Sequence, residues 1–173
     1  MSEALAIVDQ ILDEHKAIHA DFKNLGQVGS DIEAAARLEP DKTREFFAPK
    51  GLGGESAGLA RWKASLESLD RGLKAHFHKE ETALTAAFQR EGTPELADSL
   101  RQLLAEHTEI NKHVAKLLKD ADDMASGGIM MEVWESKGWG MKVNIENLQK
   151  QIAQHAERER VLLGRMKAHL NKN

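Results

Sequence analysis

The sequence predicts an all-α fold, an antiparallel up-down-up-down four-helix bundle. Apolar residues recur three and four positions apart in four long segments, which is the pattern of helices that each bury one stripe. Glycine and proline cluster between those segments, and no stretch alternates apolar and polar residues as a strand would. Because 41% of the 173 residues are hydrophobic, the chain can bury the core of one domain. We therefore expect a single domain over residues 1–173, with a long loop at about 39–57.

Each of the first two helices is defined by a buried stripe that contains a histidine. The first stripe is Ala4, Val8, Ile11, His15, Ile18, Phe22 and Leu25, with Ile32 and Ala36 as a continuation that Gly26 and Gly29 weaken. The second stripe is Leu59, Trp62, Leu66, Leu69, Leu73, His76, Glu80, Ala83 and Ala87. The breakers from Pro40 to Gly58 exceed an ordinary helix connection, and a lid, a short helix around Glu45-Phe46-Phe47 or an ordered surface loop would each fit there.

The third and fourth helices follow the same pattern. Thr93 before Pro94 predicts an N-cap with proline at the first helical position, so the third helix has a sharp start. Its stripe is Leu96, Leu100, Leu103, His107, Ile110, Val114, Leu117, Ala121 and Met124. Gly127-Gly128, with Gly138 and Gly140 beyond, are expected to separate it from the fourth helix. The fourth stripe is Met141, Ile145, Leu148, Ile152, His155, Glu159, Leu162 and Met166.

Polar residues interrupt the apolar stripes at matching heights. His76 with Glu80, and His155 with Glu159, share a His-x3-Glu spacing that places both side chains on one helical face. The midpoints between successive stripe histidines fall at residues 43–47, 91–92 and 131, at or near the expected turns. In an antiparallel bundle, the four imidazoles should therefore form one layer, with both carboxylates displaced toward the same end.

The two carboxylates favour a cation site over a structural polar layer. One His-x3-Glu pair is expected by chance in this composition, and a single stripe histidine is usually a core residue with a hydrogen-bond partner. An unpaired carboxylate in an apolar core costs several kcal/mol, however, and no stripe lysine or arginine is available to pair with either one. Four imidazoles and two carboxylates can hold two divalent ions. Imidazole suits iron, zinc, copper or nickel, and oxygen ligands also suit iron and manganese, so the mixed donor set favours iron, whereas calcium needs more oxygen ligands.

The order and spacing of these residues resemble the hemerythrin-like, or HHE cation-binding, domain over most of the chain, from about Ile7 to Met166. The resemblance implies a non-haem di-iron centre in an antiparallel four-helix bundle. Its two iron ions would be held by the terminal ligands His15, His76, His107 and His155 and the bridging ligands Glu80 and Glu159. Oxygen or another small diatomic molecule would then be the partner.

The sequence departs from the oxygen-carrying hemerythrins at two positions. These proteins have a second histidine four residues after the third-helix ligand, where this chain has Asn111, and Arg160 stands where their last aspartate would fall. One fewer nitrogen ligand implies an open or water-filled position, which favours oxygen-dependent redox chemistry, oxygen or nitric oxide sensing, or iron handling over reversible oxygen carriage. His19, one turn beyond His15, could supply a ligand, although a surface or supporting position is the more common one.

Three glutamates stand next to the candidate ligands. Glu14, Glu81 and Glu106 could orient imidazoles, but a solvated face is the commoner place for such residues, because adjacent helical positions point about 100° apart. His78 and His113 lie off the stripes and are expected to be solvated, and His169 lies near the C-terminus.

Composition and missing motifs exclude several other functions. The chain has no cysteine, which excludes disulfides, zinc–thiolate sites and iron–sulfur clusters, and its net charge of -4 argues against a nucleic-acid partner. No activated nucleophile or phosphate-binding loop is recognisable, so any oxygen-dependent redox activity would belong to the metal centre. An acidic N-terminus and the lack of a stretch of roughly 18 apolar residues predict a cytoplasmic protein without a membrane span. Two alternatives to gas chemistry remain, namely storage or buffering of iron or another divalent cation, and a metal-free helical interaction module.

Overall fold

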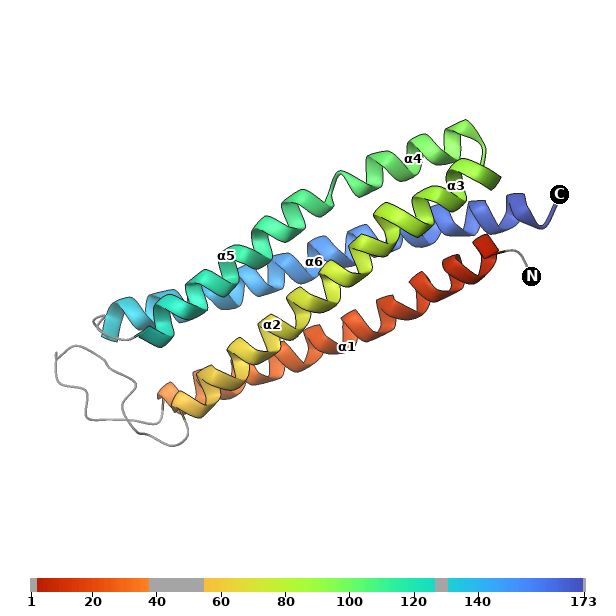
Figure 1. Ribbon diagram of the computed structural model, residues 1–173. Helices are drawn as coiled ribbons and strands as arrows, with labels where there is room; N and C mark the ends of the chain where they lie inside the picture. Colours follow the sequence, from red (N-terminus) through yellow and green to blue (C-terminus); the bar gives the residue numbers. More distant parts are fainter. Residues whose placement is uncertain (1–2, 38–54, 127–130, 173) are drawn as a thin grey trace.

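The computed structural model describes residues 3–37, 55–126 and 131–172, and all of its regular elements are helical (Figure 1). Two long single helices are α1 (Glu3–Arg37) and α6 (Met131–Leu170). A second rod is continuous from α2 (Glu55–Lys79) through the π-helical turn η1 (Glu80–Leu84) into α3 (Thr85–Glu91). The third rod consists of α4 (Pro94–Leu104) and α5 (His107–Ser126). No strand occurs in the described residues.

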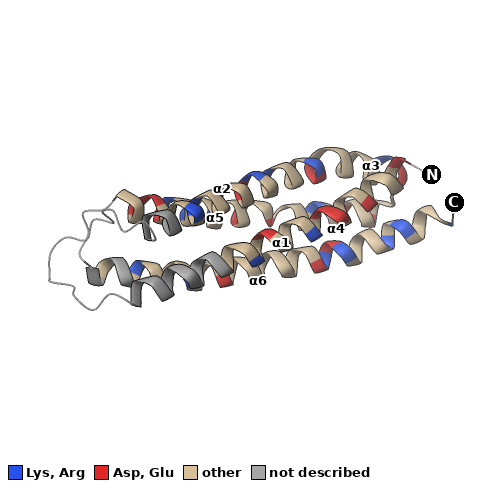
Figure 2. Cartoon of the chain, turned by 90° about the horizontal axis from the view of Figure 1, so that it is seen from below, with Lys and Arg blue, Asp and Glu red and all other residues tan. Residues whose placement is uncertain are grey.

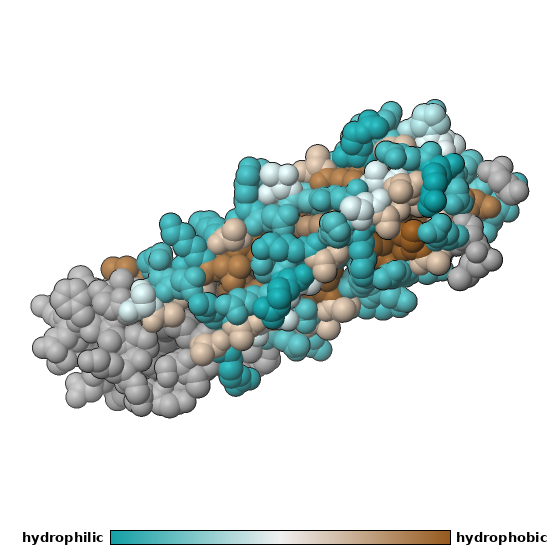
Figure 3. Space-filling view, in the orientation of Figure 1, coloured by the Kyte–Doolittle hydropathy of each residue, from teal (hydrophilic) through white to brown (hydrophobic). Residues whose placement is uncertain are grey.

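The four rods pack side by side around a common axis. Helix α1 packs on α2, α2 on α5, α5 on α6, and α6 on α1, so the contacts close a ring. Both termini lie at the same end of the molecule (Figures 1 and 2). Lysine, arginine and acidic residues are spread along the rods (Figure 2), and the face seen in Figure 3 is mostly hydrophilic, with apolar side chains showing in small patches. No helix in the described part of the chain is both long and apolar enough to cross a bilayer.

The buried core consists of two apolar clusters with a polar layer between them. In α1, Ile11 belongs to one cluster and Ile18 to the other, and His15 lies between them. In α6, Ile152 and Leu162 likewise belong to different clusters, and they flank the polar positions of that helix. The hydrophobic stripes therefore drive the helices together on both sides of the layer, and this fixes the height of the polar side chains.

Among the side chains that the structure describes, the expected stripes are confirmed except in the turn after Glu80, and Ile32, Ala36 and Leu59 lie outside them. Leu84 is fully buried there, whereas Ala83, the expected stripe residue, is exposed. The reason is the π-helical turn, which inserts one extra residue into the helix and shifts the buried face, so that Phe88 is buried beside the expected Ala87. The carbonyl oxygen of Glu80 accepts the backbone N–H of Thr85 across the widened turn, and the hydroxyl of Thr85 donates to the same oxygen at 2.8 Å.

The third expected helix is interrupted directly before His107. Helix α4 ends at Leu104 and α5 begins at His107, so Ala105 and Glu106 form a turn that the stripe pattern did not reveal. The predicted N-cap is confirmed, because the hydroxyl oxygen of Thr93 accepts a hydrogen bond from the amide of Leu96 at 3.3 Å.

Two predicted breakers were wrong, and the predicted long loop lies mostly outside the described residues. Helix α6 continues through Gly138 and Gly140, because burial of the following stripe outweighs the cost of about 1 kcal/mol for each helical glycine. The predicted loop at 39–57, including the possible short helix at 45–47, falls largely on residues 38–54, and 55–57 already belong to α2.

Candidate metal centre

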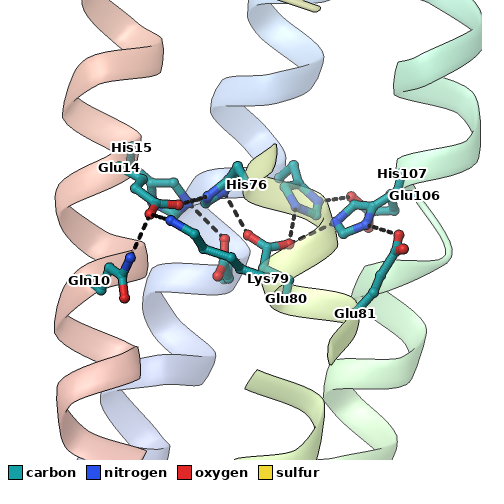
Figure 4. Close-up of polar contacts among 11 residues, drawn as sticks. Gln10, Glu14, His15, His76, Lys79, Glu80, Glu81, Glu106 and His107 are labelled. Atoms are coloured by element: carbon teal, nitrogen blue, oxygen red, sulfur yellow. Dashed lines mark hydrogen bonds and ion pairs between the residues drawn. The ribbon is translucent and has the colours of Figure 1, made fainter. Parts of the chain in front are cut away.

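The six polar stripe residues meet in one layer, to which all four rods contribute (Figure 4). Glu80 and Glu159 are fully buried, and His76, His107 and His155 are nearly so. His15 differs from the other histidines, because 16% of its side chain remains exposed. The structure thus brings together every residue that the sequence predicted for the site.

The layer contains two adjoining groups that could each hold a cation. The first group is His15, His76, Glu80 and Glu159, and the second is Glu80, His107 and His155. Within each group, the candidate ligand atoms lie within 4.8 Å of one another. Glu80 belongs to both groups: Oε1 lies 2.6 Å from Nε2 of His76, and Oε2 lies 2.8 Å from Nε2 of His107. One carboxylate can therefore face two cations at once.

These short contacts are not satisfied hydrogen bonds. All four carboxylate oxygens of Glu80 and Glu159 are buried without a hydrogen-bond partner, as are Nε2 of His107 and Nε2 of His155. The Nε2 atoms of His15 and His76 also lie only 3.1 Å apart. Buried polar atoms normally have partners, and leaving one unpaired costs about 1–3 kcal/mol. Nitrogen and oxygen atoms that converge on one place, most of them without a hydrogen-bond partner, fit the coordination of divalent cations.

Burial and neighbouring charges perturb the pKa values of the buried groups. Burial alone would raise the pKa of Glu80, but the surrounding imidazoles more than offset it and hold that pKa well below its usual range. Glu159 has a raised pKa, because burial, reinforced by the negative charge of Glu80, outweighs its contact with His15. Burial would lower the pKa of His76 and of His155, but neighbouring carboxylates raise both. In the protein without metal, the pKa values of the two buried carboxylates are therefore shifted in opposite directions.

Three outer carboxylates contact the imidazoles from the far side. An oxygen of Glu14 lies 3.1 Å from Nδ1 of His76, one of Glu81 lies 2.8 Å from Nδ1 of His107, and one of Glu106 lies 3.1 Å from Nδ1 of His155. Each glutamate thus contacts an imidazole of another rod.

The expected solvated face holds for Glu81, which is exposed although it contacts an imidazole, but not for Glu14 and Glu106, which are half-buried. A side chain next to a ligand position on the same helix points about 100° away from it, so it can reach an imidazole of the adjacent helix instead. The signal that could have identified them was an acidic residue beside a ligand position, turned toward the adjacent helix.

An aromatic side chain closes one side of the layer. The ring of Phe77 stacks on that of His107, with centroids 3.8 Å apart and an angle of 11° between the planes. It also lies within 5.9 Å of the rings of His76 and His155. Phe77 therefore separates the polar atoms from the apolar cluster on that side.

A cavity of about 100 Å³ reaches the layer between α1, α2 and α6. Its lining includes His15, Phe22, Phe77 and Ile152, and the exposed His19 also contributes to its wall. His19 is absent from both candidate cation groups, as is Asn111, whose side-chain oxygen is buried without a partner.

The remaining histidines lie outside the layer. His78 is exposed, as expected, whereas His113 is half-buried and its Nδ1 lies 3.2 Å from the side-chain oxygen of Gln151. That hydrogen bond joins α5 to α6 away from the candidate cation groups.

Comparison with known families gives one match, in which a family model of the hemerythrin HHE cation-binding domain covers residues 6–166. Comparisons with curated proteins and with solved structures gave no match.

Proposed function

Since the chain belongs to the hemerythrin HHE cation-binding domain family, we propose that it is a di-iron protein that binds or reacts with a small diatomic molecule, oxygen or nitric oxide. It would act as a sensor, carrier or redox protein. The proposed architecture is the antiparallel up-down-up-down bundle of that family. The ring of helix contacts and the position of both termini at one end support this topology.

The metal assignment depends on the unpaired donors of the layer. Glu80 and Glu159 place four buried carboxylate oxygens among imidazoles without hydrogen-bond partners, and a positive ion would remove that penalty. We propose that His15, His76 and Glu159 would hold one iron, that His107 and His155 would hold the other, and that Glu80, which belongs to both groups, would contribute to both. The mixture of imidazole and carboxylate suits iron, which would supply the redox chemistry when bound.

The route for a small molecule is the cavity beside His15. Its walls at Phe22, Phe77 and Ile152 are apolar, which favours an uncharged diatomic molecule over an ion. Asn111 supplies no nitrogen donor at the position where oxygen carriers have a further histidine, so the protein provides fewer ligands than two irons can accept. The cavity would admit such a molecule to the layer beside His15 and His76.

The test is metal content combined with the response to gas. Wild-type protein produced with iron available should contain about two irons per chain by elemental analysis, and its reduced form should change its optical spectrum on addition of oxygen or nitric oxide. Glu80→Ala should lose most of the iron, whereas Glu157→Ala, which removes an exposed carboxylate from α6, should not.

Each alternative predicts a different result. Iron without any spectral response would favour cation storage or buffering. No metal, with stability that is unaffected by chelator, would leave only a helical interaction module.

A further inference from the structure

A short pattern occurs twice in the chain, once in each half. The segments Glu14-His15 and Glu106-His107 each place a glutamate directly before a candidate ligand. The segments 76–80 and 155–159 each place a basic residue three positions, and a glutamate four positions, after a histidine. Glu80 and Glu159, which end the two segments, belong to the candidate cation groups. The glutamates that precede His15 and His107, and the two basic residues, do not belong to these groups.

The structure joins the two parts of the pattern across a helix interface in the first half. One carboxylate oxygen of Glu14 in α1 lies 3.1 Å from Nδ1 of His76 in α2, and the other contacts the ammonium group of Lys79. Lys79 lies one turn beyond His76 on the same face, so it holds the carboxylate against that imidazole (Figure 4). Gln10 donates a further hydrogen bond to the same carboxylate at 3.2 Å.

The second half repeats this arrangement with different side chains. An oxygen of Glu106 lies 3.1 Å from Nδ1 of His155 in α6. The guanidinium group of Arg158 contacts both oxygens of Glu106, at 2.6 and 2.9 Å, in a bidentate ion pair. Glu106 occupies the turn between α4 and α5, and its carbonyl oxygen accepts hydrogen bonds from two amides of the following turn. The interruption of the third rod therefore fixes the position of this carboxylate.

These contacts determine which imidazole nitrogen is available to a cation. An ionised carboxylate can only accept hydrogen bonds, so Nδ1 of the imidazole that it contacts must carry the proton. In a neutral imidazole, Nε2 then has a free lone pair, and in His76 this atom points to Glu80 at the centre of the layer. We propose that Glu14 with Lys79, and Glu106 with Arg158, are two equivalent clamps that hold His76 and His155 in the tautomer and orientation needed to bind metal. The proposal rests on the metal site of the proposed function.

The repeat breaks down at the other two histidines, and this makes the site asymmetric. Glu81, the residue after Glu80, contacts Nδ1 of His107 at 2.8 Å. The residue after Glu159 is Arg160, which instead pairs with Glu157 along α6. Within the described residues, no contact joins a carboxylate to Nδ1 of His15, the histidine that is partly exposed and lines the cavity. Three imidazoles are thus held from outside, and His15 is not.

The clamps can be tested with zinc, which is diamagnetic and binds to the same kinds of donor. Glu14→Gln and Glu106→Gln are compared with Glu157→Gln, which removes the same charge near the site without contacting an imidazole. After zinc loading, the rate of release to excess chelator is measured for each protein. Glu14→Gln and Glu106→Gln should release zinc about 10–100 times faster than wild type, and Glu157→Gln at the wild-type rate.

A second measurement separates positioning from general destabilisation. Nitrogen-15 NMR of the imidazoles reports which ring nitrogen carries the proton. The Nδ1 resonance of His76 should change in Glu14→Gln but not in Glu106→Gln, and the reverse should hold for His155. Lys79→Met leaves Glu14 in place without its anchor, so it should accelerate zinc release by a smaller factor. If Glu14→Gln does not fold, Lys79→Met still tests whether the contact between Glu14 and His76 slows zinc release.

Wild-type release rates in both glutamine variants, or equal acceleration in the control, would overturn the clamp proposal. A wild-type protein that takes up no zinc and no iron would instead contradict the proposed function. The imidazole spectra of the metal-free protein would still decide the clamps in that case, because the Nδ1 contacts do not require a metal.

Discussion

Glu159→Leu should make the metal-free protein more stable while abolishing its response to metal. Glu159 is fully buried, and neither of its carboxylate oxygens has a hydrogen-bond partner. Each unpaired buried acceptor destabilises the protein by about 1–3 kcal/mol, and the ion pair with His15 at 2.8 Å offsets part of this destabilisation. We therefore expect leucine to raise the free energy of unfolding by about 1–3 kcal/mol, as when buried ionic groups are replaced by apolar ones elsewhere. His15 is partly exposed, so water can satisfy it in the variant.

The assay is urea unfolding, followed by circular dichroism, in chelator and again with saturating metal. A cation present at 1,000 times its dissociation constant should stabilise the wild type by about 4 kcal/mol, and the variant should lose most of this gain. Leu163→Ala serves as the control, because Leu163 is fully buried in the apolar cluster of the same helix. Leu163→Ala should lower the free energy of unfolding by about 2–5 kcal/mol both in chelator and with saturating metal.

A loss of more than about 1 kcal/mol in the free energy of unfolding of metal-free Glu159→Leu would contradict this expectation. Such a result would mean that the carboxylate contributes to the fold itself. A variant that kept the full metal-dependent gain would show equally that Glu159 is not a ligand.

Three further predictions concern pH and packing. Burial would lower the pKa of His76 and of His155, but adjacent carboxylates raise both above the usual value of 6.5. The two protonated imidazoles therefore stabilise the metal-free protein fully below pH 6.5, and this stabilisation is lost as the pH rises through the raised pKa values. Urea unfolding at pH 6 and pH 8 should show this fall, and saturating metal should reverse it, since only neutral imidazole binds a cation. Phe77→Ala should cost about 3–5 kcal/mol in the same assay and accelerate metal exchange, and a loss below about 1 kcal/mol would rule out its packing role. Leu84→Ala should lower the free energy of unfolding by about 2–5 kcal/mol, and Ala83→Ser should lower it by less than about 0.5 kcal/mol. In an uninterrupted α-helix, the substitution at position 83 would instead be the more destabilising one.

Much of the fold follows from local regularity, and this part was predictable. A period of 3.6 residues per turn places stripe residues on one face, whatever the neighbouring helix is. His155 and Glu159 share a face for this reason, and the length of each segment sets the height of its histidine relative to the turn. The polar layer was therefore recognisable from spacing alone.

The local irregularities could not be predicted in the same way. The π-helical turn after Glu80 and the interruption before His107 leave no mark in the apolar pattern that precedes them. Conversely, Gly138 and Gly140 suggested a break that the packing of α6 overrides. In each case the energy of tertiary packing exceeds the propensity of one or two residues, which is about 1 kcal/mol or less.

Helical periodicity and segment length, both readable in the sequence, fix which side chains face the interior and at which height. The tertiary structure decided which imidazole each outer carboxylate contacts. Glu14 and Glu106 stand beside His15 and His107 in the chain, yet they hold His76 and His155. A residue beside a buried position points about 100° away from it, toward the interface with the next helix, so its partner depends on how closely the helices pack and how they are rotated.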